Sequence, residues 1–213
     1  MPASRSLPDG VIEGPDGRPR CWWPGADPLY LAYHDAEWGR PVKDGNRLFE
    51  KLCLEGFQAG LSWLTILRKR ENFRAAFAGF DVERVAKFGA REVKRCLADS
   101  GIVRHRGKIE SVINNAKRAR ELVDAEGSLA AFIWRYEPDP KSRPKRIERG
   151  GILPTSPESI ALSKELRRRG WSFVGPTTVY AFMQAMGLVN DHLQGCACRE
   201  EAEADRRAFV RPK

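Results

Sequence analysis

Apolar residues recur at helical spacing along most of the chain, and almost no segment alternates apolar and polar residues at period two. This pattern predicts an all-α fold. Four side chains can cap the free N–H groups of a first helical turn and so mark helix starts: Asp44, Asp81, Ser128 and Ser156. Helices are expected over residues 44–58, 63–78, 81–88, 91–98, 128–134, 156–169 and 176–187, with a long helix that ends near residue 123.

The most apolar stretch, residues 52–67, contains three side chains suited to a site: Glu55, Gln58 and Trp63. The stretch breaks before Ser62, which can cap a second helix. We therefore expect Glu55 and Gln58 near the end of one helix and Trp63 at the start of the next, so that the three converge on one elbow. An isolated buried carboxylate is costly. Glu55 therefore pairs with a lysine, caps a neighbouring helix or belongs to a functional site.

The two ends of the chain lack apolar periodicity. Residues 1–20 are rich in proline and glycine and are interpreted as a flexible leader, or at most one hairpin. Residues 199–213 form a charged tail that is expected to fray. Residues 21–198 between them are predicted to form one large domain or two small lobes that share an interface.

The chain of 213 residues carries a formal net charge of +9, and its basic residues are spread over many segments. A broad positive face favours a polyanionic partner, most simply a nucleic acid. No run approaches the roughly 20 apolar residues of a membrane span, and the N-terminus has no apolar stretch typical of a signal peptide. The five cysteines then indicate a reduced compartment, in which thiols are core residues, metal ligands or nucleophiles. A cytoplasmic location is expected.

Aromatic and metal-binding residue types are concentrated in residues 21–41. Tyr30, Tyr33 and His34 stand at i, i+3 and i+4, so a helical turn would point all three the same way. Trp38 follows in the same segment. The segment is interpreted either as part of a binding site or as an aromatic packing cluster.

Four cysteine and histidine side chains form a possible tetrahedral set: Cys21, His34, His192 and Cys196. His192 and Cys196 stand at i and i+4, so one helical turn would present both to a metal. Two cysteines and two histidines are typical of a closed structural zinc site. Cys198 is a possible substitute ligand. Such a site would tie the two ends of the domain together.

A tight turn at Val174, Gly175 and Pro176 separates two predicted helices. A glycine turn between two helices leaves free backbone N–H groups that suit a phosphate, and Gly175 permits close backbone approach. The alternative is an ordinary helix connection. His105 lies in another basic turn before a helix and is expected to be solvated or to face a phosphate.

Long motifs in chain order resemble the constitutive, type I 3-methyladenine DNA glycosylases, which belong to the helix-hairpin-helix glycosylases. The resemblance covers residues 21–198, nearly all of the chain except its tails. The motifs are DPLYLAYHDAEWGRP, LFEKLCLEGFQAGLSWLTILRKRENFR, GIVRHRGKI, FVGPTTVYAFMQAMGLVNDH and the final H-x3-C. FVGPTT resembles the hairpin of that superfamily, which places Gly175 and Thr177 at the DNA backbone.

The resemblance implies a structural zinc ion held by Cys21, His34, His192 and Cys196, joining the N- and C-terminal regions. It also implies a pocket between two helical lobes. In this pocket Glu55 would recognise the methylated base, Trp63 would stack on it and Tyr33 would line the wall. Two further aromatic residues match family positions near the pocket, Tyr30 and Trp38.

The implied activity is excision of 3-methyladenine by hydrolysis of its N-glycosidic bond in double-stranded alkylated DNA, which leaves an abasic site. N3-methylation makes the base cationic and a good leaving group. A buried carboxylate and an aromatic face both favour such a cation, after the base is flipped out of the helix at a cost of a few kcal/mol. Glu55 is the best candidate for a general base. Asp191, next to a metal ligand, is not expected to activate water.

Two other functions compete with this interpretation. One is a non-catalytic, zinc-containing protein that binds DNA damage, which the intact elbow of Glu55 and Trp63 disfavours. The other is a lyase, which would need a lysine nucleophile near the hairpin, and FVGPTT contains none. The long leader and the basic loop of residues 137–152 depart from the family pattern and are expected to be solvated. A monomer is expected.

Overall fold

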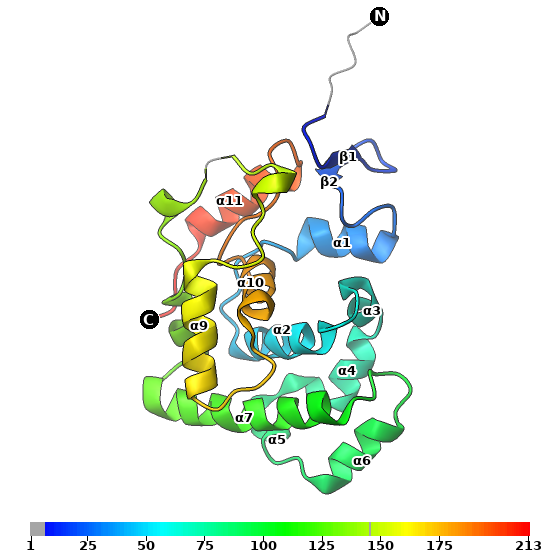
Figure 1. The fold of residues 1–213 in the computed structure, drawn as a ribbon, viewed down its shortest axis with the longest axis vertical. Helices are drawn as coiled ribbons and strands as arrows, with labels where there is room; N and C mark the ends of the chain where they lie inside the picture. The colour runs from blue at the N-terminus through cyan, green and yellow to red at the C-terminus, as the bar shows by residue number, and fades with distance from the viewer. Residues whose placement is uncertain (1–6, 145) are drawn as a thin grey trace, which may run out of the picture.

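The computed structural model describes residues 7–144 and 146–213, and most of them are helical (Figure 1). The prediction of a helical fold is therefore confirmed, apart from two short strands near the N-terminus. The strands are β1 (Val11–Glu13) and β2 (Pro19–Cys21). The helices are α1 (Pro28–Ala36), α2 (Gly45–Gln58), α3 (Trp63–Arg68), α4 (Arg70–Ala76), α5 (Val82–Val85), α6 (Ala90–Ala98), α7 (Arg106–Glu126), α8 (Leu129–Trp134), α9 (Pro157–Arg168), α10 (Pro176–Ala185) and α11 (Cys198–Ala208), with 3₁₀ turns η1 (Ala78–Phe80), η2 (Pro140–Ser142) and η3 (Arg149–Gly151).

Helix starts follow the local capping signals. The side chain of Asp44 accepts the N–H of Arg47 at 2.8 Å and begins α2. Ser62 accepts the N–H of Thr65 at 3.2 Å and begins α3. The predicted caps Asp81, Ser128 and Ser156 make the same bond to the third residue of their helices. These predicted helix starts are confirmed. They could be predicted from the sequence because a capping side chain bonds to a backbone N–H of the helix that it begins.

The prediction of one continuous helix over residues 63–78 is wrong. The first helix, α3, ends at its cap Lys69 (φ −100°, ψ 1°), and a second helix, α4, begins at the next residue. The Lys69 ammonium donates to the carbonyls of Ser100 and Gly101, so a contact distant in sequence fixes the break. Beyond α4 the chain turns with positive φ at Ala78 and Phe80, and full burial of the Phe80 ring offsets that strain.

Helix α2 lies at the centre of the molecule and packs on α3, α7, α8 and α10 (Figure 1). Its buried residues join α7 and α10 in one apolar core. At its C-terminal end the ammonium of Lys108, from α7, donates to the carbonyls of Phe57 and Ala59 at 2.9 and 2.6 Å. Because these carbonyls have no helical partner, Lys108 fixes the elbow between α2 and α3.

The N-terminal leader is ordered over its described part. Strands β1 and β2 pair antiparallel, with Val11 opposite Cys21, so the hairpin interpretation is confirmed for this part. Residues 1–6 lie outside the described residues. The hairpin packs into a second, smaller apolar cluster formed by Val11, Cys21, Ile147, Leu193, Cys196 and Cys198. The leader is therefore tied to the loop that precedes η3 and to the segment that precedes α11.

The prediction that residues 199–213 fray is wrong, because most of them form α11. Ala202 is fully buried, and Arg206 is only 8% exposed. Arg206 donates to the carbonyl of Leu188 at 3.0 Å and to Glu137 at 2.8 Å. The ring of Phe209 lies 4.5 Å from that of Trp134. The charged residues that suggested fraying therefore bind partners distant in sequence.

Within the described residues, no helix combines the length and the apolar character needed to cross a membrane.

Candidate active site and metal cluster

A cavity of about 240 Å³ opens at the elbow between α2 and α3. It is smaller than the roughly 300–1,000 Å³ of pockets for drug-sized ligands and suits one small ring system. Its wall is mainly aromatic, with one carboxylate. The lining residues are Trp22, Trp23, Tyr30, Tyr33, Trp38, Glu55, Gln58, Trp63, Ile152, Ala181 and Gln184. The predicted convergence of Glu55, Gln58 and Trp63 is therefore confirmed.

Glu55 is 5% exposed and lines the cavity. Its Oε1 lies 2.7 Å from Nζ of Lys51, one helical turn earlier on α2. Lys51 also donates to the hydroxyl of Tyr33 at 2.9 Å. Of the three sequence interpretations of Glu55, the lysine pair is confirmed, and the carboxylate also lines a cavity.

Burial lowers the pKa of Lys51 to about 8, although the Glu55 carboxylate acts in the opposite direction. Burial, helped by the charge of Glu55, raises the pKa of Tyr30 to about 12 and that of Tyr33 well above its usual value. Both tyrosine hydroxyls therefore keep their protons at neutral pH and can donate hydrogen bonds to a ligand.

Trp63 begins α3 and presents its ring to the cavity. The ring lies 5.4 Å from that of Tyr33, and the Lys51 ammonium lies 3.1 Å from its centroid. The indole N–H of Trp63 is buried with no hydrogen-bond partner in the described chain. A buried donor without a partner costs about 1–3 kcal/mol.

The aromatic residues of the predicted cluster surround the same cavity. Trp23 lies 4.9 Å from Tyr30 and 5.1 Å from Trp38, measured between ring centroids. Helix α1 carries Tyr30, Tyr33 and His34. The prediction that all three point the same way is wrong for His34, because the tyrosines line the cavity whereas His34 lies in the metal cluster. This segment therefore forms an aromatic packing cluster and also part of the cavity wall.

Asp191 does not line the cavity. It is 2% exposed, and it accepts hydrogen bonds from Tyr180 at 2.7 Å, from Gln184 at 2.8 Å and from Arg143. A carboxylate with three donors has little capacity left to activate water. Its role is to hold Gln184, which does line the cavity.

The four predicted metal ligands meet in a buried cluster, Cys21, His34, His192 and Cys196. The Cys196 Sγ lies 3.6 Å from Nε2 of His34 and 3.6 Å from Nδ1 of His192. The Cys21 Sγ lies 4.0 Å from the same His192 nitrogen. Metal bonds of about 2.0–2.3 Å around a tetrahedral zinc require separations of roughly 3.3–3.8 Å between ligand atoms. The donor set and its geometry fit a tetrahedral metal ion.

Hydrogen bonds around the cluster orient both histidines. Nδ1 of His34 bonds to Asp35 at 2.7 Å, which leaves Nε2 for a metal. Nε2 of His192 lies 3.1 Å from the carbonyl of Trp38, which leaves Nδ1. Such outer partners fix the tautomer of a metal-binding histidine. Because Trp38 lines the cavity, the cluster also supports the pocket wall.

Two details of the metal prediction need correction. His192 and Cys196 do not share a helical turn, because residues 190–197 form an irregular turn. Cys198 lies outside the four-residue cluster, because its thiol donates to Asp35 at 3.3 Å and lies on the Nδ1 side of His34, where it joins His34 and Asp35 in a second possible metal-binding group.

Helices α9 and α10 pack together and are joined by the turn predicted to meet DNA. Gly175 precedes α10 with ordinary backbone angles (φ −63°, ψ 159°) and caps it without a side chain. The residues with positive φ in this turn are Gly170 (φ 81°) and the exposed Phe173 (φ 57°). Thr177 is exposed in the first turn of α10, where N–H groups lack helical acceptors. His105 is also exposed and caps α7, with its ring 6.4 Å from that of Phe173.

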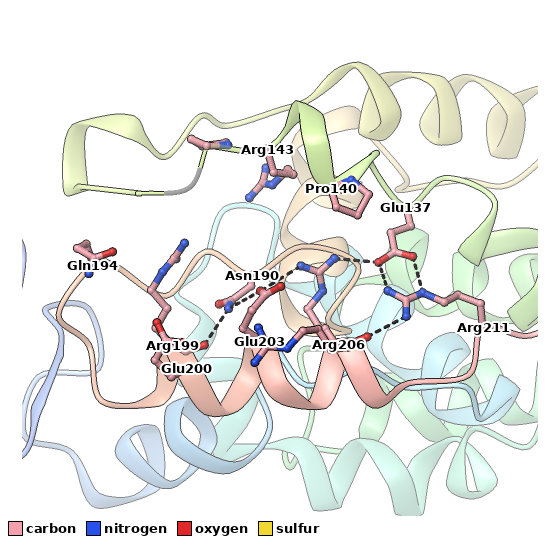
Figure 2. A pocket seen from close by; sticks show the side chains of 12 residues that line it. Glu137, Pro140, Arg143, Asn190, Gln194, Arg199, Glu200, Glu203, Arg206 and Arg211 are labelled. Atoms are coloured by element: carbon pink, nitrogen blue, oxygen red, sulfur yellow. Dashed lines mark hydrogen bonds and ion pairs between the residues drawn. The ribbon is translucent and has the colours of Figure 1, made fainter.

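A larger cavity, about 780 Å³, lies between the loop of residues 137–144 and α11 (Figure 2). Arginine is the commonest residue type in its lining, and three of these arginines bind carboxylates within the protein. Arg206 and Arg211 both bind Glu137, as the dashed lines show, and Arg143 binds Asp191. It has no aromatic wall, so the aromatic cavity is the better candidate site.

Sequence reasoning did not single out Lys51 or Gln184 as residues of the site. The signal for Lys51 was its position four residues before Glu55, where a helix brings two side chains together. The signal for Gln184 was weaker, because only the packing of α10 against α2 brings it to the cavity.

These features define a helical protein with a small aromatic pocket that contains one carboxylate, beside a cluster of four metal-binding side chains. Comparison with known proteins then narrows the class. The sequence model of the methyladenine glycosylase family matches residues 23–200. The chain is 48% identical over 179 residues to DNA-3-methyladenine glycosylase 1 of Escherichia coli, covering 84% of this chain and 96% of that protein. The chain belongs to the methyladenine glycosylase family.

Solved structures agree with this assignment. A crystal structure of 3-methyladenine DNA glycosylase I superposes with a TM-score of 0.79 at 48% identity, covering 84% of this chain and 99% of the other. A structure that describes 3-methyladenine recognition by the Staphylococcus aureus enzyme gives a TM-score of 0.76 at 39% identity, covering 81% and 92%. The hairpin of β1 and β2 precedes the residues that the family model matches. The loop on which the hairpin packs lies inside the matched residues.

Proposed function

We propose that the protein excises 3-methyladenine from alkylated double-stranded DNA by hydrolysing the N-glycosidic bond, which leaves an abasic site. One observation carries the proposal most: Glu55 and Trp63 share a cavity of about 240 Å³, in a chain 48% identical to the Escherichia coli glycosylase. A carboxylate and an aromatic face are the two groups that prefer a cationic ring to a neutral one.

Excision of this base requires selective recognition of the base more than activation of its glycosidic bond. A base methylated at N3 is positively charged while it is bonded to the sugar, so its glycosidic bond is already weak. Once the base is flipped into the cavity, Glu55 accepts its hydrogen bonds and Trp63 stacks on it. Tyr33, Tyr30 and Trp38 complete the wall and exclude water from the base. Neutral adenine gains less from both groups and is left in the helix.

Glu55 is the proposed catalytic residue, with Glu55, Trp63, Tyr33, Tyr30 and Trp38 as the residues that bind the base. Its buried carboxylate lies in the cavity, where it can stabilise positive charge on the departing base and direct a water molecule to the sugar. Asp191 is left out of this role, because it accepts three hydrogen bonds outside the cavity wall. The hairpin turn of residues 169–176 contains no lysine, so excision without strand cleavage is proposed.

The cluster of Cys21, His34, His192 and Cys196 is proposed to hold a structural zinc ion. All four positions of a tetrahedral site are supplied by buried side chains, which leaves no open position for a substrate. When bound, the ion would tie the segment around α1 to the segment before α11. The same arrangement supports residues 21–198 as the glycosylase domain, with the pocket between its helical lobes.

We propose that α9 and α10 form the helix-hairpin-helix element that holds the DNA backbone, with phosphate at Gly175 and Thr177. A Cβ atom added at Gly175 would meet nothing closer than 3.4 Å. Gly175→Val is therefore expected to fold and to weaken DNA binding about tenfold, as loss of one or two backbone hydrogen bonds would do. Fluorescence anisotropy with a duplex measures this.

Gly45→Val is the matched control for that variant. Gly45 also lies at the start of a helix with open space around it, but it is distant from the hairpin in sequence. It should leave DNA affinity unchanged. Equal affinities for the native protein and Gly175→Val would mean that this turn does not hold the backbone.

Release of 3-methyladenine from methylated duplex DNA, followed by chromatography, tests the activity itself. Free 3-methyladenine in excess of spontaneous loss is the expected result. Tight binding of the methylated duplex with no released base would instead favour the second candidate, a damage-binding protein without catalysis. The intact wall of Glu55 and Trp63 is the observation that ranks excision first.

A further inference from the structure

Lys51 lies behind the wall of the aromatic cavity and touches three of its residues. Its Nζ is 2.7 Å from Oε1 of Glu55, 2.9 Å from the Tyr33 hydroxyl and 3.1 Å from the Trp63 ring centroid. Lys51 is 5% exposed and does not itself line the cavity. Among the described residues Glu55 has no other polar partner, so its second oxygen is left to the cavity.

Packing alone does not account for an ammonium group at this position. Around it, α2 buries Leu48, Leu52 and Leu54, and an unbranched apolar side chain such as methionine would fill similar space without desolvating a charge. A buried ion pair is also seldom more stabilising than well-packed apolar residues. The charge of Lys51 therefore acts on the cavity, and its strongest contact there is Glu55.

We propose that Lys51 is a positioning residue for base recognition: its ammonium holds Glu55 as an oriented carboxylate with one oxygen turned to the bound base. The inference rests on the proposed function, in which an ionised Glu55 selects a cationic base. Without a counter-charge, a buried carboxyl group favours its neutral form. A neutral Glu55 would keep its shape but lose the charge that distinguishes 3-methyladenine from adenine.

The groups that face Lys51 define how pH acts on this pair. They are Glu55 on α2, Tyr33 and Glu37 at α1, and Arg70 on α4, while Tyr30 faces Glu55. Glu37 is bound by both terminal nitrogens of Arg70, at 2.6 and 2.9 Å, and both tyrosines stay neutral. Glu55 is therefore the carboxylate that depends on Lys51.

Two pH effects follow. Removing the ammonium favours the neutral Glu55, so the acid limb of the excision profile should move to higher pH. In the native protein burial lowers the pKa of Lys51 to about 8, so the ammonium that orients the Glu55 carboxylate is lost as pH rises through that value, and activity should decline there toward the alkaline rate of the uncharged variants. Lys51→Arg keeps a positive charge at alkaline pH and should abolish that decline.

The test is single-turnover excision of 3-methyladenine from methylated duplex DNA, measured from about pH 5 to about pH 10 and corrected for spontaneous release. Lys51→Met should lose about tenfold or more at neutral pH and recover toward native rates as pH rises. Lys51→Gln, also uncharged, replaces it if the methionine variant does not fold. Lys69→Met is the matched control, because Lys69 is half-buried, donates to the backbone carbonyls of Ser100 and Gly101 and does not line the cavity. It should keep the native acid limb.

Carbon-13 NMR of the glutamate carboxyl groups, with Glu55→Gln used to assign the signal, measures the ionisation of Glu55 without any substrate. The Glu55 signal should titrate at a higher pH in Lys51→Met than in the native protein. An unchanged titration, or an unchanged acid limb, overturns the role of Lys51. A shifted titration in a protein that releases no base upholds Lys51 and refutes excision, so the two failures are distinct.

Discussion

Glu55→Gln is expected to lower the rate of 3-methyladenine excision by about 10²-fold or more. A hydrogen bond to a charged group is worth about 1.5–3 kcal/mol, and the carboxylate also offsets the positive charge of the base in a buried site. Each 1.4 kcal/mol lost from transition-state binding is tenfold in rate. Glutamine keeps the size and one acceptor oxygen, so the fold should persist. Single-turnover base release from methylated duplex DNA is the measurement.

Glu50→Gln is the control for this variant. Glu50 stands on the same helix and pairs with Arg74 at 2.9 Å, but it does not line the cavity. Its substitution should leave excision at the native rate. Glu55→Gln also separates recognition of the methylated base from binding of the DNA, because the affinity of this variant for the duplex should change little. Native excision by Glu55→Gln would remove this carboxylate from the mechanism.

Loss of the metal cluster is expected to have the largest effect on stability. Cys196→Ala removes a ligand that lies 3.6 Å from both histidine nitrogens. Structural zinc sites contribute strongly to folding free energy, so a loss on the order of a few kcal/mol is expected. For a chain of this size that corresponds to a melting temperature lower by about 10 °C. Differential scanning calorimetry, with metal content measured beside it, checks this.

Cys53→Ala is the control for the loss of a buried thiol. Cys53 is 4% exposed in α2 and has no part in the cluster. The native chain should contain about one zinc ion, as should Cys53→Ala, whereas Cys196→Ala should contain none. Removal of the metal by a chelator should reproduce the low melting temperature of Cys196→Ala. A metal-free native protein with full thermal stability would contradict the structural role.

The sequence by itself determined those features that depend on interactions between residues close together in the chain. Asp44, Ser62 and Ser156 begin helices because each cap bonds to a residue three positions later. The elbow that brings Glu55 and Trp63 together follows from two such helices and the break between them. The resemblance of long motifs to one family added the expected roles of these residues, which local physical rules do not contain.

Only the tertiary structure decided what depends on contacts between distant residues. The break at Lys69 and the order of α11 come from partners far along the chain. Lys51 became part of the site because α1 and α3 bring Tyr33 and Trp63 to the helix that carries it. The metal cluster is the extreme case, since Cys21 and His192 are 171 positions apart. Residue types indicated the four ligands, but only the folded chain brings their atoms to bonding positions and turns Cys198 toward Asp35 instead.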